Sequence, residues 1–161
     1  GTTYTRRAGY DIIGRGGMTL SEKWSEGLRT FHGLQSNGFP NCFFLGFTQT
    51  AVTVSVPMAL NEQAKHVVYM MTEARDRGVD TVETTLEAED AWVQEIRRAQ
   101  SIGRRFYAEC TPGYYNNEGQ PSRAGAEFFV GYPEGAMAYF QYLEAWRTKG
   151  DFEGLEFRPR Q

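Results

Sequence analysis

The sequence predicts a mostly α-helical chain with a minimal sheet. Three segments place apolar residues three and four positions apart, which is the spacing of one buried helix face. One short run, residues 42–45 (CFFL), is apolar on both faces, as is typical of a strand that is covered on both sides. The length of 161 residues fits one domain and is sufficient to bury a sizeable core.

The first 56 residues are predicted to be irregular apart from that strand. Gly14, Gly16 and Gly17 indicate a turn after residues 12–13, and residues 38–41 (GFPN) indicate a second turn directly before the strand. Residues 46–55 (GFTQTAVTVS) are mostly small or β-branched and carry no charge. We expect this segment to lie against another surface.

The first long helix is predicted to start at Pro57, since proline suits the first helical position, and to end before Gly78. Its predicted buried face repeats at four- and three-residue spacing: Leu60, Ala64, Val67, Met71 and Ala74. Its predicted solvent face carries Glu62, His66, Tyr69, Glu73 and Asp76.

Residues 81–85 (TVETT) are either a short strand or the lead-in to a second helix. Thr84 or Thr85 can cap that helix, with Glu87 reaching back if Thr84 is the cap. Its predicted buried stripe is Ala88, Trp92, Ile96 and Ala99. Residues 106–132 are aromatic and loop-like.

A last helix is predicted from Pro133 through Trp146, and the tail over residues 151–157 has the composition of one more short strand. The predicted buried side of the helix is Ala136, Tyr139, Phe140, Leu143 and Trp146.

Composition excludes several classes of protein. A net charge of -3 argues against nucleic acid as a partner, and no apolar run approaches the roughly 18 residues of a membrane span. Two cysteines, Cys42 and Cys110, exclude a disulfide scaffold. Without an apolar signal segment at its start, the chain is expected to be reduced and cytoplasmic.

No self-sufficient catalytic apparatus is predicted from the residues alone. His66 is interpreted as half of an exposed pair with Glu62, and His32 as a structural hydrogen-bonding residue, in preference to catalytic or ligand roles. Cys42 is expected to be an inert buried thiol, Cys110 has no evident activating group, and no metal site is expected. Gly14 to Gly17 is not a dinucleotide fingerprint, since Thr19 stands where the next glycine is needed.

One segment has the pattern of a ligand-binding connection. A predicted strand ends at Gly46, an uncharged loop follows, and a helix begins at Pro57. In α/β sheets, ligands bind at the carboxyl ends of strands, where helix N-termini offer amides to anionic groups. An ordinary strand–loop–helix connection remains the alternative.

Four segments resemble the flavin-dependent Baeyer–Villiger monooxygenases, the family of cyclohexanone and phenylacetone monooxygenases. They are residues 12–24 (IIGRGGMTLSEKW), 38–44 (GFPNCFF) followed by Glu62 and Gln63, 88–92 (AEDAW) and 111–119 (TPGYYNNEG). The segments occur in the family's order and extend over about residues 10–120.

The resemblance implies the C-terminal part of an α/β enzyme that binds FAD and NADPH and inserts oxygen beside a ketone carbonyl. Residues 1–80 would be the end of the Rossmann-like FAD-binding domain, and residues 81–161 a helical, aromatic tail packing on it. The family's two glycine-rich nucleotide loops are absent from this sequence. We therefore expect the chain alone to be inactive, to retain no cofactor and to self-associate without the rest of its polypeptide.

The resemblance also implies roles for single residues. Cofactor contacts fall on Gly46, Phe47, Ser55, Val56 and Pro57; the substrate side falls on Thr50, Ala51, Val52, Thr53 and Val54; NADP contacts fall on Thr111, Tyr114 and Asn116. The sequence departs from better-known members over residues 47–51, which are not rich in glycine, proline and serine, and at Thr111, where several relatives have tryptophan. Alternatives are a heteroatom-oxidising flavin monooxygenase and a stand-alone interaction module.

Overall fold

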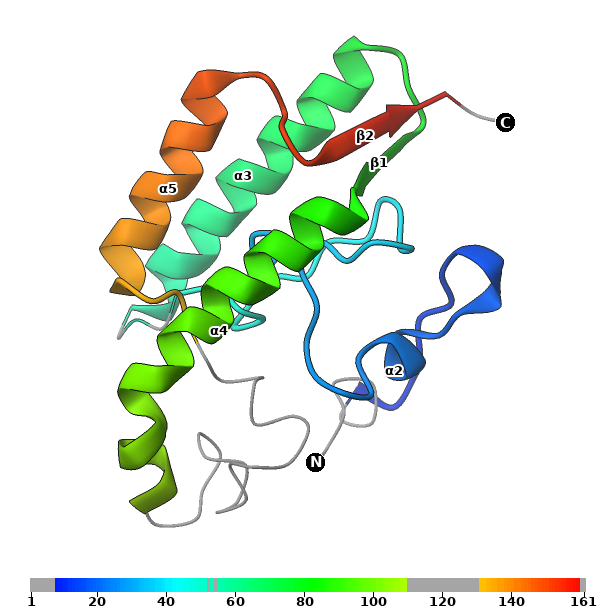
Figure 1. The fold of residues 1–161 in the computed structure, drawn as a ribbon. Coiled ribbons are helices and arrows are strands. Elements are labelled where there is room, and N and C mark those ends of the chain that lie inside the picture. Colours follow the sequence, from blue (N-terminus) through cyan, green and yellow to red (C-terminus); the bar gives the residue numbers. More distant parts are fainter. Residues whose placement is uncertain (1–7, 52, 54, 110–130, 160–161) are drawn as a thin grey trace.

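The structure, a computed structural model, describes residues 8–51, 53, 55–109 and 131–159. Three long helices dominate it: α3 (Val56–Asp76), α4 (Leu86–Glu109) and α5 (Gly135–Lys149) (Figure 1). The smaller elements are a 3-10 turn η1 (Arg15–Gly17), a one-turn helix α2 (Leu20–Lys23) and two strands, β1 (Thr81–Thr84) and β2 (Leu155–Arg158). The predicted mostly helical chain with a minimal sheet is confirmed.

The sheet consists of β1 and β2, paired antiparallel with Thr81 opposite Arg158 and Thr84 opposite Leu155. Residues 81–85 are thus a strand as well as a lead-in to α4, and the tail adds the second strand. Asn41 occupies the other edge of β1. Its N–H donates to the Val82 carbonyl at 3.0 Å, and its Oδ1 accepts from the Val82 N–H at 2.9 Å.

The predicted strand at residues 42–45 is wrong. These residues are irregular: the Phe44 N–H donates to the Leu34 carbonyl, and Cys42 bonds back to Phe39. A strand needs a neighbour to pair with, but β1 is already bonded to β2 on one edge and to Asn41 on the other. The apolar character of the segment serves packing instead, since Phe44 is buried against Trp24.

The predicted buried face of α3 is wrong by about one residue. The buried side chains are Ala59, Gln63, His66, Val67 and Met70, of which only Val67 was predicted. Leu60 and Met71 are 37% and 54% exposed. The helix starts one residue before Pro57, at Val56, and ends as predicted before Gly78.

The faces of α4 and α5 agree with the prediction where they are described. Thr85 is the cap of α4, because its Oγ1 accepts the Ala88 N–H at 3.1 Å, and Trp92 and Ile96 are buried. The side chain of Ala99 lies outside the described residues. Helix α5 begins at Gly135 and buries four of the five predicted residues: Tyr139, Phe140, Leu143 and Trp146.

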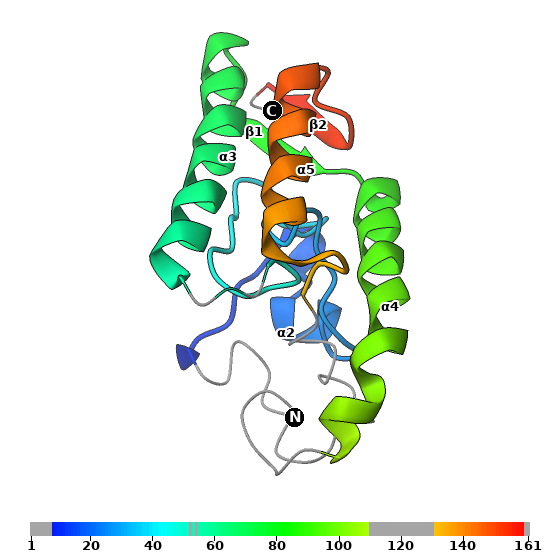
Figure 2. The same cartoon turned by 90° about the vertical axis from the view of Figure 1, so that its left-hand side faces the viewer.

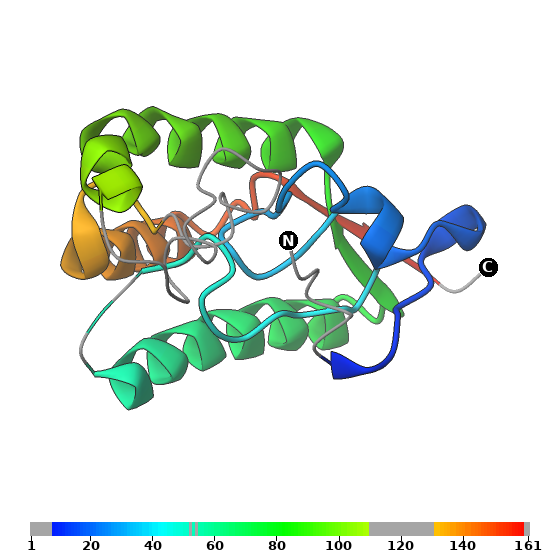
Figure 3. The same ribbon diagram turned by 90° about the horizontal axis from the view of Figure 1, so that it is seen from below.

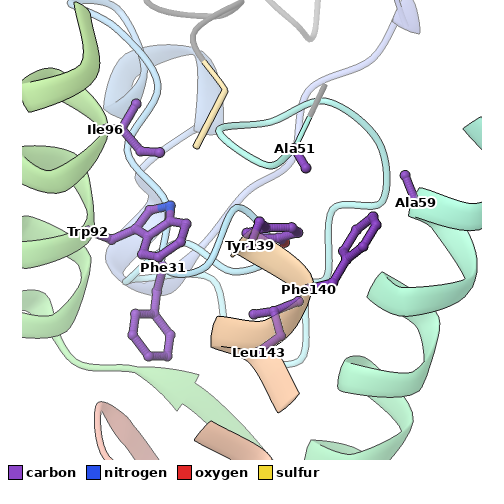
Figure 4. Close-up of a cluster of buried hydrophobic side chains, with 8 residues drawn as sticks. All are labelled: Phe31, Ala51, Ala59, Trp92, Ile96, Tyr139, Phe140 and Leu143. Atoms are coloured by element: carbon purple, nitrogen blue, oxygen red, sulfur yellow. The ribbon is translucent and has the colours of Figure 1, made fainter. Parts of the chain in front are cut away.

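The core lies where α3, α4 and α5 meet the irregular N-terminal half of the chain. Figure 2 shows α5 between α3 and α4, and Figure 3 shows the loops of residues 28–51 running between α3 and α4. The main buried cluster is drawn in Figure 4: Phe31, Ala51, Ala59, Trp92, Ile96, Tyr139, Phe140 and Leu143. Residues from before and after position 80 therefore share one core.

Candidate functional site

The loop that begins at Gly46 is attached to α3 by the side chain of Gln63. The Gly46 N–H donates to Gln63 Oε1 at 2.8 Å, and Gln63 Nε2 donates to the Gly46 carbonyl at 2.9 Å. The Thr50 hydroxyl donates to the same carbonyl at 2.6 Å. Gly46 has a φ of 139°, which only glycine adopts readily. A completely buried amide of α3 thus satisfies both backbone groups of Gly46.

The inner side of this loop is buried and bonded to distant segments. Gln49 Oε1 accepts from both the N–H and the hydroxyl of Thr30, at 3.1 and 2.6 Å. The Trp92 indole N–H donates to the Gln49 carbonyl at 3.3 Å, and the Tyr132 N–H donates to the Thr50 carbonyl at 2.9 Å. The backbone of residues 48–51 therefore has little freedom to move.

The outer side of the loop and the start of α3 carry exposed apolar side chains, which we call the apolar rim. Its members are 37–50% exposed: Leu45, Phe47, Val56, Met58 and Leu60. They flank Gly46 or lie in the first two turns of α3. The first turn of α3 contains no acidic residue, and Ser55 makes no side-chain cap. Amides at such a helix start are available to a negatively charged group.

The structure divides the predicted site residues into two groups. Gly46, Phe47, Ser55, Val56 and Pro57, the predicted cofactor contacts, belong to the loop and helix start described above and are at least partly accessible, as is Thr53. Thr50 and Ala51, predicted on the substrate side, have buried side chains. The remaining predicted residues lie outside the described part: Val52, Val54, Thr111, Tyr114 and Asn116.

Two of the sequence motifs meet at Glu83, a residue that the sequence did not single out. Its Oε1 accepts the Gly38 N–H at 2.7 Å, and its Oε2 accepts Arg15 Nε at 2.9 Å. The Arg15 N–H also donates to the Gly38 carbonyl at 2.8 Å. The glycine turn at residues 14–17 therefore docks on the turn at residues 38–41, which confirms its interpretation as a turn.

A second buried carboxylate, Glu89, joins segment 88–92 to segment 12–24. It accepts the Ser36 hydroxyl at 2.8 Å and the Asn37 N–H at 2.9 Å, and it lies 2.9 Å from Lys23 Nζ. Both charged side chains are nearly excluded from water. The sequence did contain a signal that Glu89 is buried. Glu89 lies three residues before Trp92 and seven before Ile96, which places it on the same buried helix face.

The two histidines form a buried chain, so the interpretation of His66 as an exposed partner of Glu62 is wrong. His66 is 0% exposed, and its Nε2 lies 3.1 Å from Nδ1 of the equally buried His32. Arg147 NH1 lies 3.3 Å from His66 Nδ1, and the Tyr142 hydroxyl lies 3.3 Å from His32 Nε2. His32 has the hydrogen-bonded structural environment that was expected of it.

The direction of the hydrogen bonds in this chain follows from Arg147. A guanidinium can only donate, so His66 Nδ1 accepts and the proton of neutral His66 lies on Nε2. His66 then donates to His32 Nδ1, and His32 donates from Nε2 to the Tyr142 oxygen. Burial lowers the pKa of His66 to about 3, with a further contribution from Arg147; burial and then His66 hold the pKa of His32 well below its usual range.

Other reactive groups are few in the described part of the chain. Cys42 is half-buried, and burial raises its thiol pKa, as befits an unreactive thiol. Cys110 lies outside the described residues. Over the described ranges, no three His, Cys, Asp or Glu side chains are grouped to hold a metal ion. No helix in those ranges combines the length and apolar composition that a membrane crossing requires.

Known proteins resemble this chain over nearly its whole length. It is 46% identical to neopentalenolactone D synthase of Streptomyces avermitilis, over 98% of the chain and 26% of that protein. It is 42% identical to Baeyer-Villiger monooxygenase 4 of Dietzia sp., over 94% of the chain and 24% of that protein. No protein-family model matches the chain.

The fold agrees with these relatives. The polycyclic ketone monooxygenase of Thermothelomyces thermophila superposes with a TM-score of 0.84 and 34% identity, over 98% of this chain and 26% of that one. The chain thus spans about a quarter of the length of the curated relatives that it matches. By both sequence and fold, it belongs to the Baeyer–Villiger monooxygenase family.

Proposed function

We propose that this chain is the C-terminal part of an FAD- and NADPH-dependent monooxygenase that inserts oxygen beside a ketone carbonyl. Residues 1–80 close the FAD-binding domain in this proposal, and residues 81–161 pack on it as a tail. Its flavin- and substrate-facing segment is residues 46–57. The observation that carries the proposal is the combination of three features in one segment. The side chain of Gln63 holds Gly46, the first turn of α3 contains no acidic residue, and the exposed apolar side chains of the rim belong to both the loop and the helix start.

The residues present suit a flat ring on which negative charge accumulates when it is reduced. A Cβ on Gly46 would have no atom within 4 Å, so open space lies beside its backbone. The start of α3 offers amides and no competing carboxylate. Bound FAD would supply the electron-transfer and oxygen-activating chemistry that side chains lack.

The chain's own residues bind, orient and exclude water. Gln63 sets the distance between the Gly46 loop and α3. Amides at Val56 and Met58 stabilise negative charge on the cofactor, and the apolar rim keeps water from the reacting atoms. Thr50 and Ala51 support the loop from its buried side, because their side chains are buried. Phe47, Thr53 and Ser55 remain accessible and can contact cofactor or substrate directly.

The remaining parts of the proposal concern the longer polypeptide. Thr111, Tyr114 and Asn116 contribute to the NADP side, and Val52 and Val54 to the substrate side. The chain on its own is inactive and retains no cofactor. It self-associates through the apolar rim, because exposed apolar surface of this kind is normally covered by a partner.

Product analysis tests the reaction. The full-length protein that contains this chain is incubated with NADPH, oxygen and a cyclic ketone, beside the 161-residue chain alone. We expect a lactone from the full-length protein and no turnover from the short chain. Turnover by the short chain contradicts the proposed dependence on the rest of the polypeptide. An N- or S-oxide product from suitable amines or sulfides, with no lactone, favours the heteroatom-oxidising alternative.

A pair of substitutions on α3 tests the flavin-facing role. Val56→Asp places a carboxylate at the helix start, whereas Val68→Asp places one on a 60% exposed site three turns further along. In the full-length protein we expect Val56→Asp to weaken FAD retention at least about tenfold, because a like charge meets the anionic cofactor. Equal flavin occupancy in the two variants would contradict the placement.

A further inference from the structure

A cavity of about 400 Å³ lies between α4, α5 and the turn before β2, apart from the loop discussed above. Five aromatic side chains and two carboxylates contribute to its wall, which is completed by small residues: Phe31, Trp92, Tyr132, Tyr142, Trp146, Glu95, Glu153, Ala88, Ala91 and Gly154. Three of the lining residues are exposed to solvent: Ala91, Tyr142 and Glu153. Its size is that of a small-molecule site.

The aromatic wall is continuous and braced. Trp92 stacks on Tyr132 with ring centroids 5.5 Å apart, and Tyr142 lies 5.5 Å from Trp92 and 5.9 Å from Tyr132. The Trp92 indole is fixed by its hydrogen bond to the Gln49 carbonyl, and the backbone of Tyr132 is bonded to the Thr50 carbonyl. Figure 4 shows the indole of Trp92 projecting from α4 above Phe31. The rings are therefore arranged before any ligand arrives.

The charge around the cavity is negative among the described residues. Arg98 is shared between Glu95 and Glu134, at 2.8 Å from each, and Lys149 is shared between Asp151 and Glu153, at 2.7 Å from each. Each side of the cavity therefore has one basic group for two carboxylates. These carboxylates affect the tyrosines of the cavity. The pKa of Tyr132 is raised to about 12, mainly by burial and then by Glu134 and Glu95. The pKa of Tyr142 is raised by burial and then by Glu153 and Glu95.

We propose that this cavity binds a small organic ammonium ion, with the charged head against Trp92, Tyr132 and Tyr142 and between Glu95 and Glu153. Aromatic faces attract cations through their quadrupole, and methylated ammonium groups are recognised in this way. Among the described residues that line the cavity there is no lysine or arginine; Arg98 and Lys149 pair with Glu95 and Glu153 without being part of the lining. The lining includes none of residues 46–57, although Trp92 and Tyr132 are bonded to the backbone of residues 49 and 50. Occupation of the cavity does not depend on the proposed oxygenation.

The test compares choline with its uncharged isostere 3,3-dimethylbutan-1-ol, titrated into the full-length protein at low ionic strength. Calorimetry and tryptophan fluorescence, which Trp92 and Trp146 report, measure binding. We expect saturable binding of choline at least about fivefold tighter than that of the alcohol. Equal binding of the two, or no saturable binding of choline, overturns the proposal.

Substitutions locate the site. Glu95→Gln and Glu153→Gln are each expected to weaken choline binding about two- to fivefold, and Tyr142→Leu to weaken it similarly by removing a ring face. Glu144→Gln, on the exposed side of α5 and outside the cavity lining, is the matched control and leaves the affinity unchanged. Choline affinities equal to the control in all three variants overturn the assignment to this cavity. Circular dichroism verifies that each variant is folded.

Discussion

His32 Nδ1 and His66 Nε2 lie 3.1 Å apart in the interior, and the geometry around them requires both rings to be neutral. Protonation of His66 would place a second proton on Nδ1, directly facing the Arg147 guanidinium at 3.3 Å. Protonation of His32 would direct an N–H from Nδ1 at the N–H of His66. The pair connects an N-terminal loop to α3 and, through Tyr142 and Arg147, to α5. Its neutrality is therefore a condition for packing these elements.

Acid is accordingly expected to destabilise the fold. Both rings have pKa values below their usual range in the folded state, whereas the unfolded chain takes up protons below pH about 6.5. The contribution of the neutral rings to the free energy of unfolding is thus fully present above pH about 6.5 and is lost as the pH falls towards about 3. Between pH 7.5 and 5 we expect the free energy of unfolding to fall by about 2 kcal/mol because of His66, and further because of His32. Urea denaturation at several pH values measures it.

The variant His66→Gln serves as the control for this dependence. It removes one titrating ring, so its stability should change less between pH 7.5 and 5 than that of the parent. A parent protein equally stable at both pH values would show that the rings are not held neutral.

Glu89 and Lys23 are expected to be strongly coupled, because both charges are nearly excluded from water. Glu89→Gln leaves the Lys23 ammonium buried without its partner, at a cost of about 3–5 kcal/mol. Lys23→Met should cost less, because Arg29 Nε remains 3.5 Å from the Glu89 carboxylate. The double variant Lys23→Met/Glu89→Leu should recover part of this loss. Denaturation of the three variants gives the coupling energy.

The exposed neighbour provides the comparison. Asp90 pairs with Arg29, but more than half of its side chain is in solvent, so Asp90→Asn should cost less than about 1 kcal/mol. Similar losses for Asp90→Asn and Glu89→Gln would contradict the importance of burial here.

Gly14 is expected to tolerate no side chain. A Cβ there would clash with the Gly38 carbonyl oxygen and lie 2.8 Å from the Phe39 ring, and backbone atoms cannot move aside as a flexible side chain can. Gly14→Ala should therefore cost about 2–3 kcal/mol by separating the two turns. Gly16 has a φ of 67° but open space around it, so Gly16→Ala should cost only about 1 kcal/mol of strain. Thermal denaturation ranks the two variants, and the reverse order would refute the close packing.

The long elements were predictable because their signals are local. The buried stripes of α4 and α5 have helical spacing, and Thr85 stands where a cap is needed. The family resemblance, now confirmed, rested on short motifs whose residues meet in space, such as Arg15 with Gly38 and Lys23 with Glu89.

What could not be predicted depends on contacts between distant residues. On α3, Gln63 and His66 are buried only because Gly46 and His32 supply partners, and a local pattern treats both as solvent-facing. Leu60 is exposed although it fits an apolar stripe. The placement of residues 42–45 likewise depended on whether another strand was free to pair. The aromatic cavity required knowledge of how α4 and α5 pack.

Gln63 provides the last prediction, because one side chain satisfies both backbone groups of Gly46. Gln63→Met keeps the volume but leaves the Gly46 N–H and carbonyl without these partners, and each unsatisfied group costs about 1–3 kcal/mol unless the loop moves to water. We expect the loop to move, so amide hydrogen exchange at residues 46–48 should accelerate at least about tenfold. Gln63→Glu keeps an acceptor for the Gly46 N–H but repels the Gly46 carbonyl. Its exchange rate at residues 46–48 should therefore lie between those of the parent and of Gln63→Met. Gln94→Met, an exposed glutamine on α4, is the matched control. Exchange in Gln63→Met as slow as in this control would mean that Thr50 and the buried inner side of the loop hold Gly46 without Gln63.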